Sequence, residues 1–93
     1  MAITIKIPKL LQDKTGGTVL TEVEGGTVDA CIADLIRQYP GLNGMILDGK
    51  GKVLLKWIVY VNDRIAASSR KSPHPVKDGD RILPELVHPG HRR

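Results

Sequence analysis

The chain has no phenylalanine, and its aromatic residues are limited to Trp57, Tyr39 and Tyr60, 3% of the sequence. Proteins that bind single-stranded nucleic acid stack bases on several aromatic side chains set among basic ones. Here the 14 lysines and arginines outnumber the 10 acidic residues, but they are scattered along the chain rather than gathered in one run. We therefore expect a soluble protein with a net charge of +4 and no nucleic-acid partner.

Cysteine and long apolar runs are equally scarce. The single cysteine, Cys31, excludes an internal disulfide. No apolar stretch reaches the length of a signal peptide or of a membrane-spanning helix. The 93 residues contain no internal repeat and are enough for one domain. The sequence therefore predicts one cytoplasmic domain with no membrane partner.

What the chain does contain is a set of segments with the pattern of β-strands. In the first, Ile3, Ile5 and Ile7 alternate with polar residues until Pro8 removes a backbone donor. The third is apolar at nearly every position, which predicts a strand covered on part of both faces. The expected strands are residues 3–7, 19–24, 53–61 and 81–87, with a loop at 9–14 and one short extra strand allowed.

The strongest periodic signal lies between the second and third of these strands. Thr27 is a favourable N-cap, and Pro40-Gly41 ends the helix that follows. Its apolar residues recur on one face, at Val28, Cys31, Ile32, Leu35, Ile36 and Tyr39. Because Cys31 lies within this stripe, a buried and inert thiol is favoured over a persulfide acceptor. The order of elements predicts an α+β fold in which a mixed four- to five-stranded sheet packs on one main helix.

Several short segments recur in the order and spacing of a known family. They are Ile7-Pro8 with Thr15-Gly16-Gly17 near the start, Tyr39 closing the helix, Ile58–Asp63 in the central strand, and Asp78–Pro84 at the last turn and strand. In these features the chain resembles the ThiS/MoaD family of ubiquitin-like sulfur carrier proteins, and within it the CysO-type carriers of cysteine biosynthesis. The resemblance implies a β-grasp, or ubiquitin-like, domain over residues 1–88 and a flexible C-terminal tail at 89–93.

In ThiS/MoaD carriers the reactive group is the chain's own terminal carboxylate. A partner converts it to an acyl-adenylate, and sulfur then displaces AMP to leave a thiocarboxylate. The resemblance therefore implies a carrier that is not an enzyme, has no catalytic side chain and binds no cofactor or metal itself. It also implies an E1-like adenylyltransferase of the MoeB/ThiF type, which uses ATP and magnesium, and a sulfur-accepting enzyme of cysteine, molybdopterin or thiamine biosynthesis.

The end of the chain departs from the family, whose members finish in Gly-Gly. Here Pro89-Gly90 is followed by His91-Arg92-Arg93, so Gly90 is the candidate acyl end and a protease would have to remove the last three residues. Val87, His88 and Pro89 would then thread the partner's channel, where a glycine end lets the backbone approach ATP closely. Two alternatives stay open. The chain is a β-grasp interaction module that has lost the diglycine and the sulfur chemistry, or its closing residues are foreign and hide the native end.

A sheet covered by one helix leaves its other face to solvent, where an apolar patch can dock a partner. We predict such a patch for the adenylyltransferase at Ile58, Tyr60 and Leu86. The competing interpretation of these residues is ordinary packing beneath a loop, which we favour for Leu54. The histidines His74, His88 and His91 are interpreted as solvated rather than as a metal site, because no cysteine or carboxylate cluster completes one.

Overall fold

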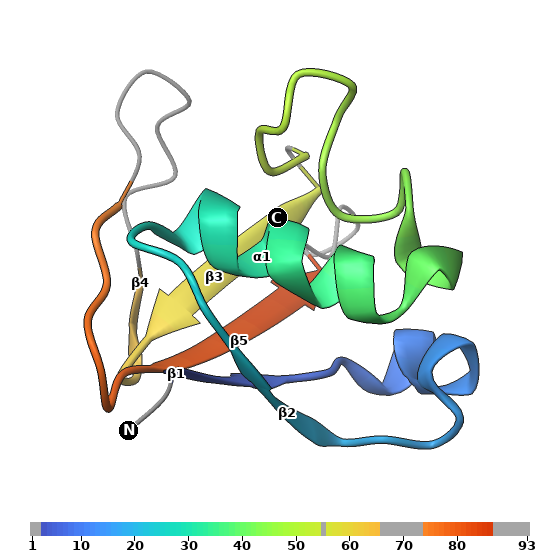
Figure 1. Cartoon of the computed structure of the whole chain (residues 1–93), viewed down its shortest axis with the longest axis horizontal. Helices are drawn as coiled ribbons and strands as arrows, with labels where there is room; N and C mark the ends of the chain where they lie inside the picture. Colours follow the sequence, from blue (N-terminus) through green and yellow to red (C-terminus); the bar gives the residue numbers. More distant parts are fainter. Residues whose placement is uncertain (1–2, 55, 66–73, 87–93) are drawn as a thin grey trace, which may run out of the picture.

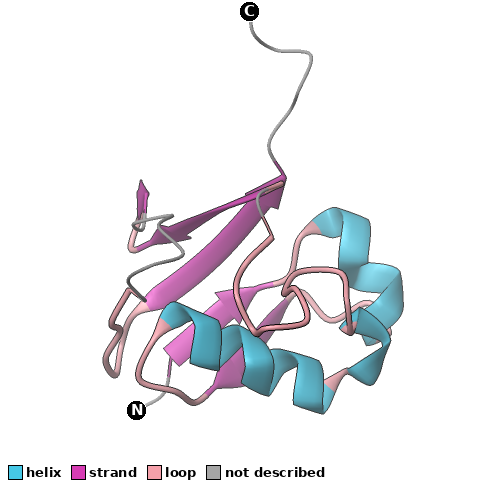
Figure 2. Cartoon of the chain, turned by 90° about the horizontal axis from the view of Figure 1, so that it is seen from above, coloured by secondary structure: helices cyan, strands magenta, loops and turns pink. Residues whose placement is uncertain are grey.

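The computed structural model describes residues 3–54, 56–65 and 74–86, which form one sheet with helical segments on one side (Figures 1 and 2). The sheet has five strands in the order β2-β1-β5-β3-β4. The strands are β1 (Ile3–Lys6), β2 (Leu20–Val23), β3 (Trp57–Val61), β4 (Arg64–Ile65) and β5 (Arg81–Leu86). The α-helix is α1 (Val28–Gln38), and two 3₁₀ helices are η1 (Lys9–Thr15) and η2 (Pro40–Leu42).

The first and last strands lie side by side in the middle of this sheet. β1 and β5 are parallel, with Thr4 beside Arg81 and Ile5 beside Ile82, whereas every other recorded pairing is antiparallel. Parallel neighbours need a long crossover connection, and α1 lies within it, across one face of the sheet (Figure 1). The mixed sheet on one main helix confirms the expected α+β β-grasp, and β4 is the short extra strand.

The core lies between α1 and the sheet. Ile3, Ile5 and Ile7 are all buried, as the alternation in the first segment predicts. From the helix, Val28, Cys31, Ile32 and Leu35 pack onto them. The segment after α1 closes one end of the core with Leu42, Ile46 and Leu47, which are also buried. The amphipathic pattern therefore predicted this core correctly.

Two of the secondary-structure predictions are wrong. Residues 9–14 are not a loop but most of η1, which buries Leu11 and is tied to β1 by a hydrogen bond of 3.0 Å from Gln12 Nε2 to the carbonyl of Ile7. The third strand begins at Trp57 rather than residue 53, because the Trp57 N–H turns back to the carbonyl of Leu54 at 3.1 Å. Val53 makes only an isolated bridge to Leu47.

The predicted ends of the helix are close to the observed ones. Thr27 is the N-cap, and its side chain accepts a hydrogen bond of 3.1 Å from the Ala30 N–H. Gly25 precedes it at a point where the backbone passes very close to α1. A Cβ added to Gly25 would lie 2.8 Å from the Cys31 nitrogen and 2.9 Å from the Ala30 carbonyl carbon. Only glycine fits there, so Gly25 sets how closely β2 and α1 pack.

Gly25→Ala should lower the free energy of unfolding by about 1–3 kcal/mol, because the new methyl group meets backbone atoms that must shift. Urea unfolding followed by circular dichroism measures this change. Gly26→Ala is the matched control, since a Cβ at Gly26 meets nothing within 4 Å. Equal losses in the two variants would show that the close approach at Gly25 is unimportant.

A second local constraint ties β3 to β5. Asp80, only 6% exposed, accepts hydrogen bonds of 2.9 Å from Asn62 Nδ2 and from the Lys77 N–H. The Asn62 side chain in turn accepts from the Arg81 N–H at 2.9 Å. These contacts, above all the hydrogen bond from Asn62, hold the pKa of Asp80 below its ordinary value. The ionised carboxylate thus fixes the turn between β3 and β4 to the start of β5.

Asp80→Asn should lower the Tm at neutral pH, because an amide facing the Lys77 N–H leaves two donors together. A carboxylate with a depressed folded-state pKa stabilises the protein above its unfolded-state pKa, and this contribution is lost on protonation. The difference in Tm between the wild-type protein and the variant should therefore shrink as the pH falls below about 4. Thermal melts across pH measure it, with the exposed turn residue Asp78→Asn as control; a gap independent of pH would contradict the role of Asp80.

Candidate functional site

The candidate site is the end of β5 and the surfaces beside it. β5 lies between β1 and β3 and ends at Leu86, opposite Trp57. The Trp57 indole is held by a hydrogen bond of 2.8 Å from its Nε1 to the Met45 carbonyl. The predicted acyl end Gly90 and the threading residues Val87, His88 and Pro89 lie outside the described residues. What the structure establishes is that β5, which leads to these residues, pairs with β1 at its first two residues and with β3 up to Leu86.

The predicted docking patch is divided between the two faces of the sheet. Trp57, Val59 and Val61 are buried beneath α1, so Ile58 and Tyr60 point to the opposite, open face, where both are half-buried. Leu86 pairs with Trp57 and packs against the core with it. The prediction that Leu86 shares a surface with Ile58 and Tyr60 is therefore wrong. Leu54 packs against the core, as expected.

The open face has a wider apolar row than the sequence prediction named. Tyr60 lies opposite Leu83 of β5 and also opposite Ile65 of β4. Farther along, Lys6 of β1 lies opposite Leu20 of β2, on the same side of the sheet. Ile65 and Leu20, at the two sheet edges, are 63% and 60% exposed. We call Leu20, Lys6, Leu83, Tyr60 and Ile65 the open-face row. Side chains alternate between the two faces along residues 81–86, so Leu83 and Leu86 lie on opposite faces. This alternation is the sequence signal that favours Leu83 over Leu86 as a residue of the open face.

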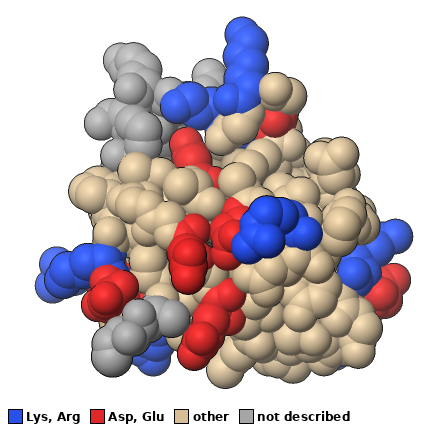
Figure 3. Space-filling model, in the orientation of Figure 1, with Lys and Arg blue, Asp and Glu red and all other residues tan. Residues whose placement is uncertain are grey.

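The opposite side of the molecule carries a group of charged side chains. Over α1, acidic and basic side chains lie next to one another (Figure 3). Asp34 is the centre of one such group, with Arg37 Nε donating to its Oδ1 at 3.0 Å and the Glu24 N–H donating to its Oδ2 at 3.1 Å. These contacts, led by Arg37, lower the pKa of Asp34. This part of the helix surface is therefore occupied by hydrogen-bonded charged side chains rather than by an apolar row.

Cys31 is buried in the helical stripe, as predicted. Its side chain has no exposed surface, and the thiol donates to the Gly25 carbonyl at 3.6 Å. Burial, reinforced by the negative charges of Asp34 and Asp80, raises the pKa of Cys31 to about 11. The thiol is thus protonated at neutral pH and shielded from reagents.

The described part of the chain offers little other chemistry. Within residues 3–54, 56–65 and 74–86, no group of three or more His, Cys, Asp or Glu side chains could hold a metal ion. In that same part of the chain, no helix is long and apolar enough to span a membrane. What remains is the root of the tail and the surfaces around it.

Comparison with known proteins agrees with the sequence pattern. The sulfur carrier protein CysO of Mycobacterium tuberculosis (strain ATCC 25618 / H37Rv) is 33% identical over an alignment of 91 residues, covering 94% of this chain and 98% of that protein. A chain in the crystal structure of the Amycolatopsis orientalis BexX/CysO complex superposes with a TM-score of 0.82 at 31% identity, covering 94% of this chain and 97% of that one. The crystal structure of Mycobacterium tuberculosis CysO gives a TM-score of 0.79 at 30% identity, covering 92% and 99%.

The same assignment follows from a family model. The model of the ThiS family matches residues 5–89, which include the α-helix, the second half of β1 and all of the other described strands. The predicted resemblance, including its CysO-type character, is therefore confirmed. The chain belongs to the ThiS family.

Proposed function

We propose that this protein is a sulfur carrier whose C-terminal carboxylate, at Gly90, is activated as an acyl-adenylate and converted to a thiocarboxylate. The observation that carries the proposal is the family match over residues 5–89, which spans the β-grasp and reaches the residue before Gly90. The relatives' name, sulfur carrier protein, supports the same role. Because activation consumes ATP, the proposal also places the carrier in the cytoplasm.

The chemistry needs no side chain of the carrier. A Gly90 carboxylate oxygen attacks the α-phosphate of ATP, held with magnesium by an E1-like adenylyltransferase, and pyrophosphate leaves. A sulfur nucleophile at the sulfide oxidation level then attacks the carbonyl carbon, the bond to the AMP oxygen breaks, and a thiocarboxylate remains. An acceptor enzyme then consumes the thiocarboxylate. We favour an enzyme of cysteine synthesis over one of molybdopterin or thiamine synthesis. Before activation, a protease removes His91-Arg92-Arg93 and so exposes the Gly90 carboxylate.

The position of β5 suits this role. β5 is held by β1 at Arg81 and Ile82 and by β3 from Ile82 to Leu86, where the tail begins. Partner forces on the tail are then resisted by the whole sheet rather than by one edge. Val87, His88 and Pro89 would pass through the partner's channel from this fixed starting point, and Pro89 restricts His88 to extended conformations.

The open-face row gives the partner a surface to recognise. It crosses all five strands, with apolar side chains from β2, β5, β3 and β4 and the lysine Lys6 from β1. Tyr60 lies between Leu83 and Ile65 in this row, and a buried aromatic residue commonly supplies much of the binding free energy of an interface. We assign docking of the adenylyltransferase to this row together with Ile58.

If the carrier proposal is correct, protein purified from its native host should have an intact mass that ends at Gly90. A fraction should be heavier by the difference between one sulfur and one oxygen atom. Mass spectrometry under non-reducing conditions measures both quantities. A mass that includes Arg93 in every preparation would instead favour an interaction module that has lost the sulfur chemistry.

Tyr60→Glu should weaken pull-down of the adenylyltransferase by at least about tenfold, because it places a charge between the apolar side chains of Leu83 and Ile65. The fold should persist, since Tyr60 is on the open face rather than in the core. Ala33→Glu, which adds the same charge on the exposed side of α1, is the matched control. Undiminished pull-down by a folded Tyr60→Glu variant would refute the docking assignment.

A further inference from the structure

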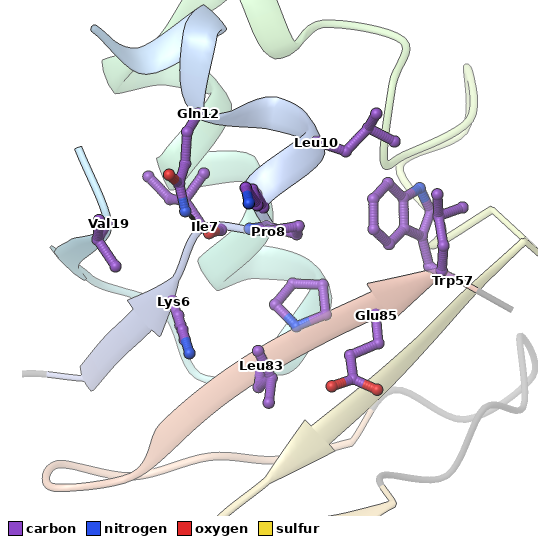
Figure 4. Close-up of a pocket in the computed structure, with 12 residues that line it drawn as sticks. Lys6, Ile7, Pro8, Leu10, Gln12, Val19, Trp57, Leu83 and Glu85 are labelled. Atoms are coloured by element: carbon purple, nitrogen blue, oxygen red, sulfur yellow. Dashed lines mark hydrogen bonds between the residues drawn. The ribbon is translucent and has the colours of Figure 1, made fainter. Parts of the chain in front are cut away.

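A groove of about 670 Å³ lies where β1 turns away from β5 (Figure 4). η1 forms one wall of the groove and β5 forms the other, with Trp57 at one end and Val19 at the opposite end. The groove shares Lys6 and Leu83 with the open-face row, whereas Leu20, Tyr60 and Ile65 are not part of its lining. Leu86, the last described residue before the tail, is part of its lining.

The β5 wall is an unpaired strand edge. Pairing of β5 with β1 is recorded only at Arg81 and Ile82, so Leu83–Leu86 has no strand beside it on this side among the described residues. Backbone groups alternate in direction along a strand. The Arg81 carbonyl accepts from the Asn62 N–H on the β3 side, whereas the Asp80 carbonyl accepts from the Thr4 N–H on the β1 side. By this alternation the Pro84 carbonyl and the Leu86 N–H point into the groove.

The other described strand edges are less suited to accept a partner strand. At β2, Gln38 Nε2 donates to the Glu22 carbonyl at 2.9 Å, and the Glu24 N–H donates to Asp34 at 3.1 Å. Side chains of the α1 face thus already bond to the backbone at that edge. At the opposite end of the sheet, β4 has only two residues. Unpaired edges recruit extended segments, and here the available edge is that of β5.

The side chains around the groove specify what kind of segment fits. Leu10 and Val19 are 64% and 44% exposed, so apolar side chains of a segment bound along the groove would cover apolar surface of each residue. Lys6 and Lys9 lie on the β1 and η1 side, and neither has an ion-pair partner among the described residues. Glu85 is the single acidic side chain of the lining. The groove is therefore apolar, with an excess of positive charge on one rim.

We propose that this groove binds an extended segment of the protein that receives the C-terminal tail, and that this segment carries alternating apolar side chains and a carboxylate. The segment adds to the β5 edge through the Pro84 carbonyl and the Leu86 N–H. Its apolar side chains lie against Leu10 and Trp57, and its carboxylate faces Lys6 and Lys9. The identity of the partner rests on the proposed function, because a protein that encloses a tail beginning after Leu86 also lies against the groove. The preference for an extended acidic segment rests on the lining of the groove alone and is independent of the proposed function.

Selection of random peptides displayed on phage against the full chain tests the groove directly. The enriched peptides should carry Asp or Glu next to two apolar residues spaced two apart. Their binding should shift the amide resonances of Leu10, Glu85 and Leu86. N-methylation of a selected peptide should abolish binding only at alternate residues, because only every second N–H of an added strand faces β5.

Charge variants test the carboxylate. Lys9→Glu should weaken a selected peptide by about fivefold, as expected for loss of an exposed ion pair and its replacement by repulsion. Lys50→Glu changes net charge equally at an exposed turn outside the groove, and it should leave affinity nearly unchanged. The same comparison with the adenylyltransferase should show a weaker complex for Lys9→Glu only.

Several results would overturn the proposal. They are enrichment of no peptide or of basic peptides, resonance shifts confined to Tyr60 and Ile65, and equal tolerance of N-methylation at every position. Concentration-dependent shifts at Leu10 and Leu86 without peptide would assign the groove to a second copy of the chain instead. A protein that binds acidic peptides but carries no thiocarboxylate in its native host would retain the groove and disprove the carrier role, so the two failures are distinguishable.

Discussion

The parallel pairing of β1 with β5 is the constraint on which the rest of this structure depends. It joins the two ends of the chain at the middle of the sheet, where Ile5 and Ile82 lie side by side and are both fully buried. The connection between them must cross one face of the sheet, which places α1 over the core and leaves the other face open. The same pairing fixes the start of β5, the strand that leads to the C-terminal tail, in the middle of the sheet.

The length of that pairing matters as much as its existence. The next donor of the ladder after Ile82 would be the nitrogen of residue 84, and Pro84 has no N–H. β1 leaves the sheet after Lys6, η1 follows, and the unpaired edge Leu83–Leu86 becomes one wall of the groove. The pairing of β5 with β1 thus ends before Pro84. The first part of β5 is paired with β1, whereas Leu83–Leu86 pairs, among the described residues, only with β3 and leaves its other edge available for binding.

Much of this arrangement was predictable from the sequence, because burial leaves a periodic pattern. The isoleucines of β1, the apolar stripe of α1 and the Thr27 cap all lie where the pattern predicts. The start of β3 was not predictable, since an apolar run does not reveal that Trp57 turns back to Leu54. The prediction put Leu86 on the wrong face, because the face depends on the register of Leu86 with Trp57. The sequence does indicate the correct face, since Leu86 is an even number of residues after the buried Ile82 and so points to the same side.

Under the proposed function, the carrier recognises its partners through its surfaces, and its own side chains must not react with the activated C-terminus. An exposed thiol would be a competing nucleophile toward an acyl-adenylate and could trap it as a thioester. Here the single thiol, Cys31, is buried in the helical stripe with its pKa raised to about 11. The contacts that keep it inert, the Gly25 carbonyl and the packed core, are those that hold α1 on the sheet. The packing that stabilises the fold is therefore the same packing that would keep this thiol away from the activated terminus of the proposed carrier.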